Sequence, residues 1–307
     1  MSKGATDGEP VVVVSPHPDD AAYSVGGLLS GHVLAGPVSG VTVFTRSHVM
    51  NYGEPPLSRA LSKPLNLLSS QPRINRVRGR LKTLEVTRIR KREDANYLEA
   101  IGARRIDLDL LDAPLRGYGW SPWVSSIAVV RNDPILRVVA RLFGNLIAPL
   151  VAAASPTAMR ISESRGNSGR WVVLLPLGLG GHVDHLILRE ACSGVAQNTV
   201  RIYYEDLPYA ARLSYDEIER VVRDFDSGLR PHLFNIEAYL ARKVENLRLY
   251  KSQVGEKEVE QVLRHANRLG ANQIPCERLW YRPLPGDCAA TKFLDQEECY
   301  PSEKFSP

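Results

Sequence analysis

The chain has 307 residues, of which 44% are hydrophobic and 24% charged, with a formal net charge of +5. This composition is typical of a globular protein with a sizeable core and argues against intrinsic disorder. No window of about 18 uninterrupted apolar residues occurs, so we expect no membrane-spanning helix. The first ten residues lack the apolar core of a signal peptide, which favours a cytoplasmic protein. Four cysteines without C-x-x-C spacing leave a late disulfide open but do not require one.

Predicted strands and helices alternate along most of the chain. A continuous apolar run begins at Val11 and predicts the first strand, which leads into a helix over 21–34. Further strands are expected at 38–45, 105–111, 171–175 and 201–204. Further helices are expected at 79–102, 134–154, 214–225, 236–254 and 257–269, with a possible last strand in CERLWYR. This alternation predicts βαβ units and a largely parallel sheet.

We expect a single domain, with a core over about 10–210 and a C-terminal helical and strand elaboration over 211–307. Two polar segments, 46–71 and 155–170, are predicted as long loops, which often act as lids or substrate walls. In open α/β sheets, ligands bind beyond the carboxyl ends of the strands. The search for functional residues therefore concentrates on the residues that directly follow each strand.

Two histidine-containing motifs stand at that position. His17-Pro18-Asp19-Asp20 follows the first strand, and His182-Val183-Asp184-His185 follows the fourth. Either motif alone is explained as well by helix capping, because aspartate is favoured at helix N-termini. Together they offer two imidazoles and a carboxylate, which is a familiar donor set of catalytic zinc sites. A metal there would make hydroxide available at neutral pH, while a second carboxylate serves as base and a spare histidine as acid.

The sequences SPHPDDAAYSVGG and GGHVDH resemble the motifs of the LmbE/PIG-L superfamily of zinc-dependent N-deacetylases. The resemblance implies a Rossmann-like, three-layer α/β/α fold and hydrolysis of the acetamide of an N-acetyl amino sugar or glycoside. It implies zinc as the cofactor, although iron(II) suits the same nitrogen and oxygen donors. The implied partner is a small N-acetylated amino sugar; nucleic acid is not expected.

Roles follow from the resemblance residue by residue. His17, Asp20 and His185 become the metal ligands, and Asp19 becomes the general base. A protonated His182 would stabilise the oxyanion or protonate the leaving amine, with Asp184 behind it. One position departs from the family pattern, because Ala21 stands where a glutamate usually follows the paired aspartates. A hydrogen bond close to the metal would then be missing, which affects the tuning of the metal and the substrate subgroup.

Residues outside the two motifs are weaker candidates. Arg46, after the second strand, and Arg90, in the expected helix over 79–102, are candidate substrate-binding residues, although Arg90 could instead pair with Glu93 on the helix surface. Aromatic residues of the RGYGWSPW loop could stack on a sugar or simply pack on the core; they are Tyr118, Trp120 and Trp123. Glu205 and Asp206 follow the fifth strand, where both site residues and helix caps occur.

Several other functions are less consistent with the motifs. No G-x-G-x-x-G follows the first strand, and neither a P-loop nor a G-x-S-x-G elbow occurs, which argues against dinucleotide enzymes, kinases and serine hydrolases. An amidase acting on thiol conjugates or other non-sugar amides would use the same metal centre and remains an alternative. A non-catalytic metal-binding module and an anion-binding protein that uses RINRVRGR are the remaining alternatives.

Overall fold

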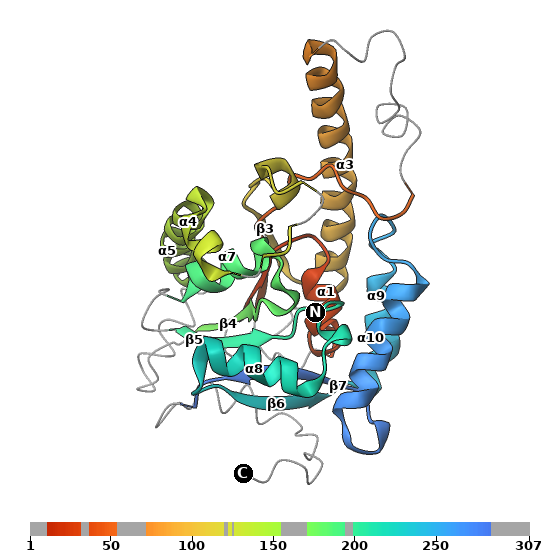
Figure 1. The fold of residues 1–307 in the computed structure, drawn as a ribbon. Helices are drawn as coiled ribbons and strands as arrows, with labels where there is room; N and C mark the ends of the chain where they lie inside the picture. Colours follow the sequence, from red (N-terminus) through yellow and green to blue (C-terminus); the bar gives the residue numbers. More distant parts are fainter. Residues whose placement is uncertain are drawn as a thin grey trace.

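The computed structural model describes residues 11–31, 37–53, 72–119, 122–124, 126–154, 171–193 and 199–283. These residues form a seven-stranded sheet with the order β3-β2-β1-β4-β5-β7-β6 (Figure 1). The strands are β1 (Val11–Ser15), β2 (Val38–Thr42), β3 (Arg104–Asp107), β4 (Trp171–Pro176), β5 (Thr199–Tyr204), β6 (Arg230–Asn235) and β7 (Cys276–Tyr281). The first five are parallel, whereas β7 runs antiparallel to both β5 and β6.

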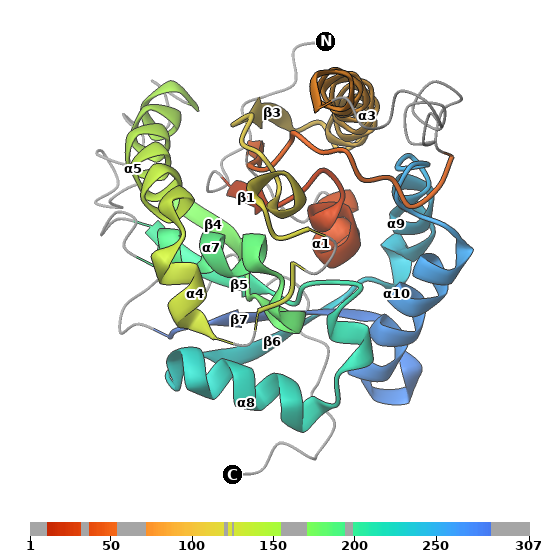
Figure 2. The same cartoon turned by 45° about the horizontal axis from the view of Figure 1, so that its top comes forward.

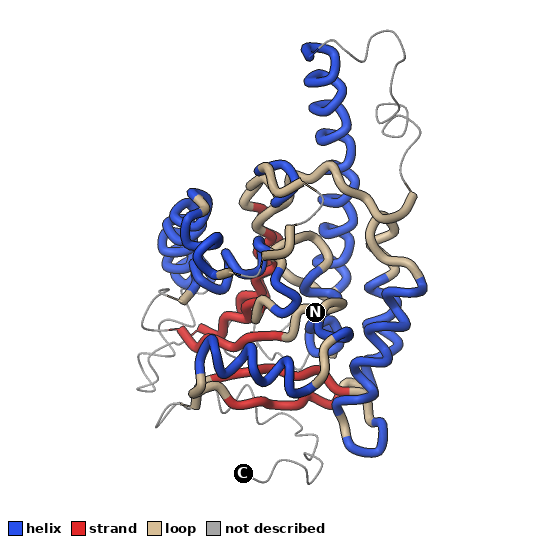
Figure 3. The backbone as a smooth tube through the Cα atoms, in the orientation of Figure 1, coloured by secondary structure: helices blue, strands red, loops and turns tan. Residues whose placement is uncertain are grey.

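Helices cover both faces of this sheet (Figure 2). They are α1 (Asp20–Ser30), α3 (Pro72–Ala100), α4 (Ile127–Asn132), α5 (Pro134–Ala154), α7 (Val183–Cys192), α8 (Tyr215–Asp226), α9 (Leu240–Leu247) and α10 (Glu256–Leu269). Helices α1, α3, α9 and α10 lie on one side, and α4, α5, α7 and α8 on the other (Figure 2). The predicted α/β class, with a largely parallel sheet between helical layers, is confirmed (Figure 3). Among the described residues, no helix has the length and apolarity needed to cross a bilayer.

Burial explains which elements the sequence reveals. The valines of β1 are at most 1% exposed, because β2 and β4 flank this strand and helices cover both faces. Such strands appear as continuous apolar runs in the sequence.

Strand β6 was not predicted, because Pro231 lacks the backbone N–H that a strand normally donates. The strand tolerates this proline because it lies at the edge of the sheet. The helix expected over 236–254 is shorter and spans Leu240–Leu247. The segments 54–71 and 155–170, in the expected loops, lie outside the described residues.

Helix α1 is held by the C-terminal part of the chain. It kinks at Val25 (φ −129°, ψ 20°), which frees the backbone N–H groups of the following turn. The N–H groups of Gly27 and Leu28 each donate to Glu277 of β7 at 2.8 Å, and Lys243 of α9 pairs with the same carboxylate. A β-carbon at Gly27 would lie 2.8 Å from a side-chain carbon of Ile236, so this close approach requires glycine. The C-terminal elements thus support the helix that follows the first motif.

A second buried carboxylate joins β5 to the same C-terminal elements. Glu205 accepts hydrogen bonds from Arg278 Nε (2.5 Å) and Trp280 Nε1 (3.0 Å), and lies 2.9 Å from His265 Nε2. Burial alone would raise the pKa of Glu205, but the charge of Arg278 and the contact with His265 lower it to about 2. The folded protein therefore binds the ionised form of Glu205 more favourably than the unfolded chain does.

The Glu205→Gln substitution is expected to reduce the free energy of unfolding at pH 7 by about 3 kcal/mol, because the Arg278 cation would stay buried without its partner. A lowered carboxyl pKa stabilises the fold above its unfolded value of 4.5, and this contribution is lost as the pH falls towards 2. Urea denaturation of both proteins at pH 7 and pH 3 should therefore show a smaller difference at the lower pH. An equal difference at both pH values would contradict the assignment.

Candidate metal centre

Strands β1 and β4 bring the two motifs together. They are adjacent and parallel, with Val11 opposite Val172, so their carboxyl ends lie at the same edge of the sheet. The chain leaves β1 towards β2 on one side and leaves β4 towards β5 on the other. This reversal of strand order is the place where α/β sheets bind their ligands. The His17–Asp20 segment connects β1 to α1, and His182–His185 opens α7.

One group of side chains from both motifs can hold a metal ion. Ligand atoms of His17, Asp20 and His185 all lie within 4.8 Å of one another. The Asp20 Oδ2 oxygen lies 3.2 Å from His17 Nδ1 and 3.5 Å from His185 Nε2. The side chain of His185 is fully buried, and its Nε2 atom has no hydrogen-bond partner. Because buried polar atoms are almost always paired, this nitrogen fits a metal ligand that faces Asp20.

The charge of Asp20 also favours metal binding by the His17, Asp20 and His185 group. Burial would raise the pKa of Asp20, but the neighbouring His185 and His17 lower it to about 2, so the carboxylate is ionised at neutral pH. Asp20 Oδ2 also accepts the backbone N–H of His17 at 2.7 Å, which fixes the carboxylate across the turn. Asp19 occupies the N-cap position of α1 without a side-chain capping bond, so helix capping does not explain the paired aspartates.

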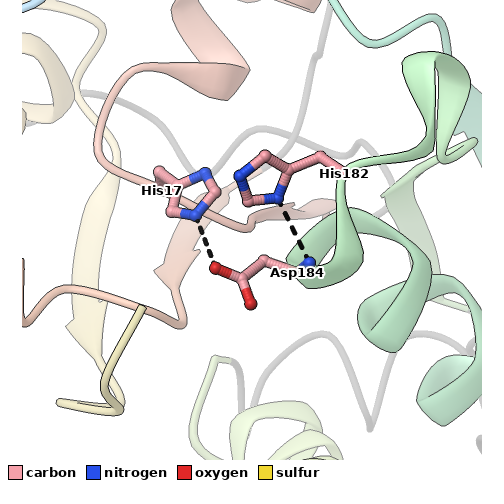
Figure 4. A group of neighbouring side chains, drawn as sticks. All are labelled: His17, His182 and Asp184. Atoms are coloured by element: carbon pink, nitrogen blue, oxygen red, sulfur yellow. Dashed lines mark hydrogen bonds and ion pairs between the residues drawn. The ribbon is translucent and has the colours of Figure 1, made fainter. Parts of the chain in front are cut away.

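A second group, His17, His182 and Asp184, lies beside the first (Figure 4). The carboxylate of this group, Asp184, already has hydrogen-bond and ion-pair partners within the protein. Asp184 Oδ2 lies 2.9 Å from His17 Nε2 and accepts the N–H of Ala113, while Arg116 pairs with Oδ1 at 2.7 Å. The two ring nitrogens of His17 thus face different carboxylates, with Nδ1 towards Asp20 and Nε2 towards Asp184. We regard this group as support for His17, because a supporting carboxylate on the far nitrogen is typical of metal-bound histidines.

This geometry changes the expected position of Asp184. Its carboxylate was expected behind His182 but contacts His17 instead, and only the backbone N–H of Asp184 reaches His182 Nδ1, at 3.2 Å. The protonation state of His182 also differs from the protonated ring that the sequence led us to expect. Burial, together with the charges of His17 and His185, holds the pKa of His182 well below its usual range, which favours the neutral ring.

Asp19 lies next to this cluster but points to a different partner. Its Oδ1 atom lies 3.3 Å from Arg90 of α3, which also donates to Ser47 Oγ at 3.2 Å. Burial raises the pKa of Asp19 to about 7, against the opposing effect of Arg90. The carboxylate of Glu93 is bonded to Ser252 rather than to Arg90. Arg90 therefore contacts Asp19 of the first motif, which sequence reasoning did not anticipate.

The remaining candidates differ in their distance from the cluster. Trp123 is 50% exposed, forms a β-bridge with His182, and its ring meets the His182 ring edge-on at 6.1 Å. Tyr118 donates instead to Asp133, and Trp120 lies outside the described residues. Arg46 bridges Leu111 through its backbone and exposes its side chain. Arg46 follows a strand as the converging residues do, and the sequence contains no other signal that separates it from them.

Three residues around the cluster lie outside the two motifs. Arg116 comes from the aromatic loop and pairs with Asp184, which the sequence did not indicate. Asp206, one of the weaker candidates, lies 2.6 Å from His185 Nδ1, and its place shortly after β5 was the only signal in the sequence. Tyr209 stacks on His182 with ring centroids 6.2 Å apart. Its approach depends on Gly180 (φ +80°), where a β-carbon would lie 2.6 Å from the Tyr209 β-carbon.

Comparison with known proteins identifies the family of this chain. The family model for PIG-L, GlcNAc-PI de-N-acetylase, matches residues 12–196. This chain belongs to the PIG-L family. It is 32% identical over 261 residues to 2'-N-acetylparomamine deacetylase of Streptomyces fradiae, covering 84% of this chain and 78% of that relative. Membership confirms the resemblance seen in the motifs and identifies the chain as an N-deacetylase, a hydrolase acting on amide bonds.

Solved structures share the fold. The A40926 pseudoaglycone deacetylase superposes with a TM-score of 0.53 at 22% identity, covering 88% of this chain and 96% of that one. The zinc-inhibited form of teicoplanin deacetylase gives a TM-score of 0.57 at 18% identity, covering 88% of this chain and 97% of that one.

Ala21 stands where the family motif usually has a glutamate. The residue is 4% exposed and packs in the hydrophobic core.

Divalent metal is expected to stabilise the protein through the His17, Asp20 and His185 group. At about 100 times its dissociation constant, a ligand of the folded state adds about 2.7 kcal/mol to the free energy of unfolding. Zinc titrated into metal-free protein should therefore raise the midpoint of urea unfolding. His185→Ala should remove most of this gain, whereas His48→Ala, a histidine outside both groups, should keep it. Equal gains in the two variants would exclude His185 as a ligand.

Proposed function

We propose that this protein is a zinc-dependent N-deacetylase that removes the acetyl group from an N-acetylated amino sugar of a small glycoside, releasing acetate and the free amine. The observation that carries the proposal is the convergence of His17, Asp20 and His185, with the unpaired Nε2 of His185 facing Asp20, beside the separate carboxylate of Asp19. The substrate class is supported by the Streptomyces fradiae relative, whose name describes a deacetylase of 2'-N-acetylparomamine.

His17, Asp20 and His185 would hold the metal, which supplies a Lewis acid and an activated water when bound. Two imidazoles and a carboxylate are a common zinc donor set, and iron(II) accepts the same donors. The site is largely closed to solvent at these three residues, each of which is at most 8% exposed. A low dielectric environment strengthens every charge interaction at the site.

Asp19 is the proposed general base. Its side chain is 12% exposed, and Arg90 holds its Oδ1 atom. Arg90 therefore acts in this proposal through Asp19, in addition to the substrate contact expected from the sequence. Because Asp19 directly precedes Asp20, the proposed base and the proposed ligand stand on adjacent residues at the start of α1. A base in reach of the water proton is the first geometric requirement of general base catalysis.

His182 is the proposed donor to the substrate. Its Nδ1 atom accepts the N–H of Asp184, which leaves the proton of the neutral ring on Nε2. A neutral imidazole in this tautomer can donate a hydrogen bond to the acetyl oxygen as negative charge develops there. The Tyr209 ring on one side and the His17 ring on the other limit rotation of His182.

The sugar is proposed to bind against Trp123. This indole is half exposed next to His182 and offers a flat apolar surface at the rim of the site. An aromatic face with a polar edge suits the alternating apolar and hydroxyl faces of a sugar ring. Arg46 remains a proposed contact at the same rim, because its exposed side chain follows β2 at the carboxyl edge of the sheet.

The substrate class can be tested with two amides assayed side by side. Zinc-loaded protein should release acetate from an N-acetylated aminoglycoside or N-acetylglucosaminide and should act far more slowly on a cysteinyl amide conjugate. Acetate release is measured directly, so no assumption about the sugar is needed. Turnover of the cysteinyl amide without any release of acetate from the sugars would overturn the proposed substrate class.

The Asp19→Asn substitution is expected to lower kcat by roughly 10²–10⁴-fold, which is the usual contribution of a positioned general base. The amide keeps the size of the side chain and the hydrogen bond at Oδ1 but cannot accept the proton. Metal content, measured by elemental analysis, should stay at the wild-type level. A variant that kept wild-type kcat with full metal content would show that another group takes the proton.

The Trp123→Ala substitution is expected to raise KM for the amino sugar by about ten-fold with little change in kcat. Loss of the indole face exposes about two apolar carbon groups of the sugar, each contributing about 0.8 kcal/mol when buried, and 1.4 kcal/mol corresponds to ten-fold in affinity. Trp123→Phe, which keeps an aromatic face, should retain most of the affinity. Steady-state kinetics of the three proteins would argue against sugar stacking if both variants matched the wild type in KM.

A further inference from the structure

Asp206 makes two short contacts at the far side of the proposed metal ligand His185. Its Oδ1 atom lies 2.6 Å from His185 Nδ1, and its Oδ2 atom accepts the backbone N–H of Leu179 at 2.8 Å. The side chains of Asp206 and His185 are both fully buried. No solvent competes for this carboxylate, so its two oxygens bind one ring nitrogen and one backbone group.

The contact with Asp206 determines which ring nitrogen of His185 can bind a metal. A carboxylate beside Nδ1 favours the tautomer with the proton on Nδ1, which leaves a lone pair on Nε2. That Nε2 atom is the buried nitrogen without a hydrogen-bond partner, 3.5 Å from Asp20 Oδ2. We propose that Asp206 is a positioning residue that fixes the tautomer and orientation of His185 for metal binding. This inference rests on the metal site proposed above.

The backbone around Asp206 holds the carboxylate in place before any metal binds. Its carbonyl oxygen accepts the N–H of Ala210 at 2.9 Å, and the next residue, Leu207, donates its N–H to Ser24 Oγ of α1 at 3.1 Å. Asp206 is therefore anchored next to the helix of the first motif.

The two proposed histidine ligands are thus supported in the same way from different parts of the chain. Asp184 faces the far nitrogen of His17, and Asp206 faces the far nitrogen of His185. Asp184 belongs to the second motif, whereas Asp206 lies beyond residues 12–196, over which the family model matches. Carboxylates in this position typically change metal affinity by about 10–100-fold when they are removed.

The test compares Asp206→Asn with the neighbouring variant Glu205→Gln. Asparagine has the size of aspartate but only one acceptor oxygen, so either His185 or the Leu179 N–H loses its partner. We expect zinc affinity, measured by competition with a chromogenic chelator, to fall by about 10–100-fold in Asp206→Asn. Glu205→Gln removes an equally buried carboxylate that does not contact His185, so its zinc affinity should stay within about three-fold of wild type although its stability falls.

Two results separate this inference from the proposed function. Unaltered protein that bound no divalent metal would overturn both. Unaltered protein that bound zinc tightly, together with folded Asp206→Asn that bound it within two-fold of the same affinity, would overturn only the role of Asp206. Circular dichroism and urea denaturation of the metal-free proteins establish that the variants compared are folded.

A measurement on the unaltered protein avoids dependence on the folding of any variant. Nitrogen-15 NMR of zinc-loaded protein with labelled histidines reports which ring nitrogen carries the proton. His185, assigned by the loss of its signals in His185→Gln, should be protonated on Nδ1 with Nε2 shifted by the metal. A proton on Nε2, with the metal on Nδ1, would overturn the inference whatever the variants show.

Discussion

The pairing of β1 with β4 is the constraint on which the site depends. Parallel pairing places the carboxyl ends of two strands, more than 150 residues apart in sequence, at one edge of the sheet. Because the order of strands reverses there, the two following helices diverge and leave room between their N-termini. The first motif arrives with α1 and the second with α7, so neither could form the cluster alone. The site is therefore a property of the sheet topology as much as of the motifs.

The charges at this edge are costly to bury, and the fold compensates for each of them. Burying a carboxylate or an imidazolium costs several kcal/mol unless a partner remains in contact. Asp184 has Arg116 and His17, Asp206 has His185 and the Leu179 N–H, and Asp19 has Arg90. The Nε2 atom of His185 is buried without a hydrogen-bond partner and lies 3.5 Å from Asp20 Oδ2. A buried ring nitrogen that lacks a partner and faces a carboxylate fits a metal ligand.

Sequence reasoning recovered the features that local pattern determines. The buried run at Val11 predicts β1 because both faces of a central parallel strand are covered, and the histidines after two strands predict convergence at the sheet edge. It could not recover the contacts that depend on tertiary packing. Asp184 shares a motif with His182, yet its carboxylate contacts His17, because the α7 turn directs it across the site. The links of Glu277 and Asp206 to the two motifs join segments up to 250 residues apart and leave no periodic signal.

The central claim is that one metal ion binds to His17, Asp20 and His185 rather than to the neighbouring group of His17, His182 and Asp184. Anomalous X-ray diffraction from zinc-loaded crystals at the zinc absorption edge locates the ion directly. The structure predicts one peak at about 2.0–2.2 Å from His17 Nδ1, His185 Nε2 and a carboxylate oxygen of Asp20. A peak bound instead by His17 Nε2, His182 and Asp184, or no peak in this region, would contradict the account.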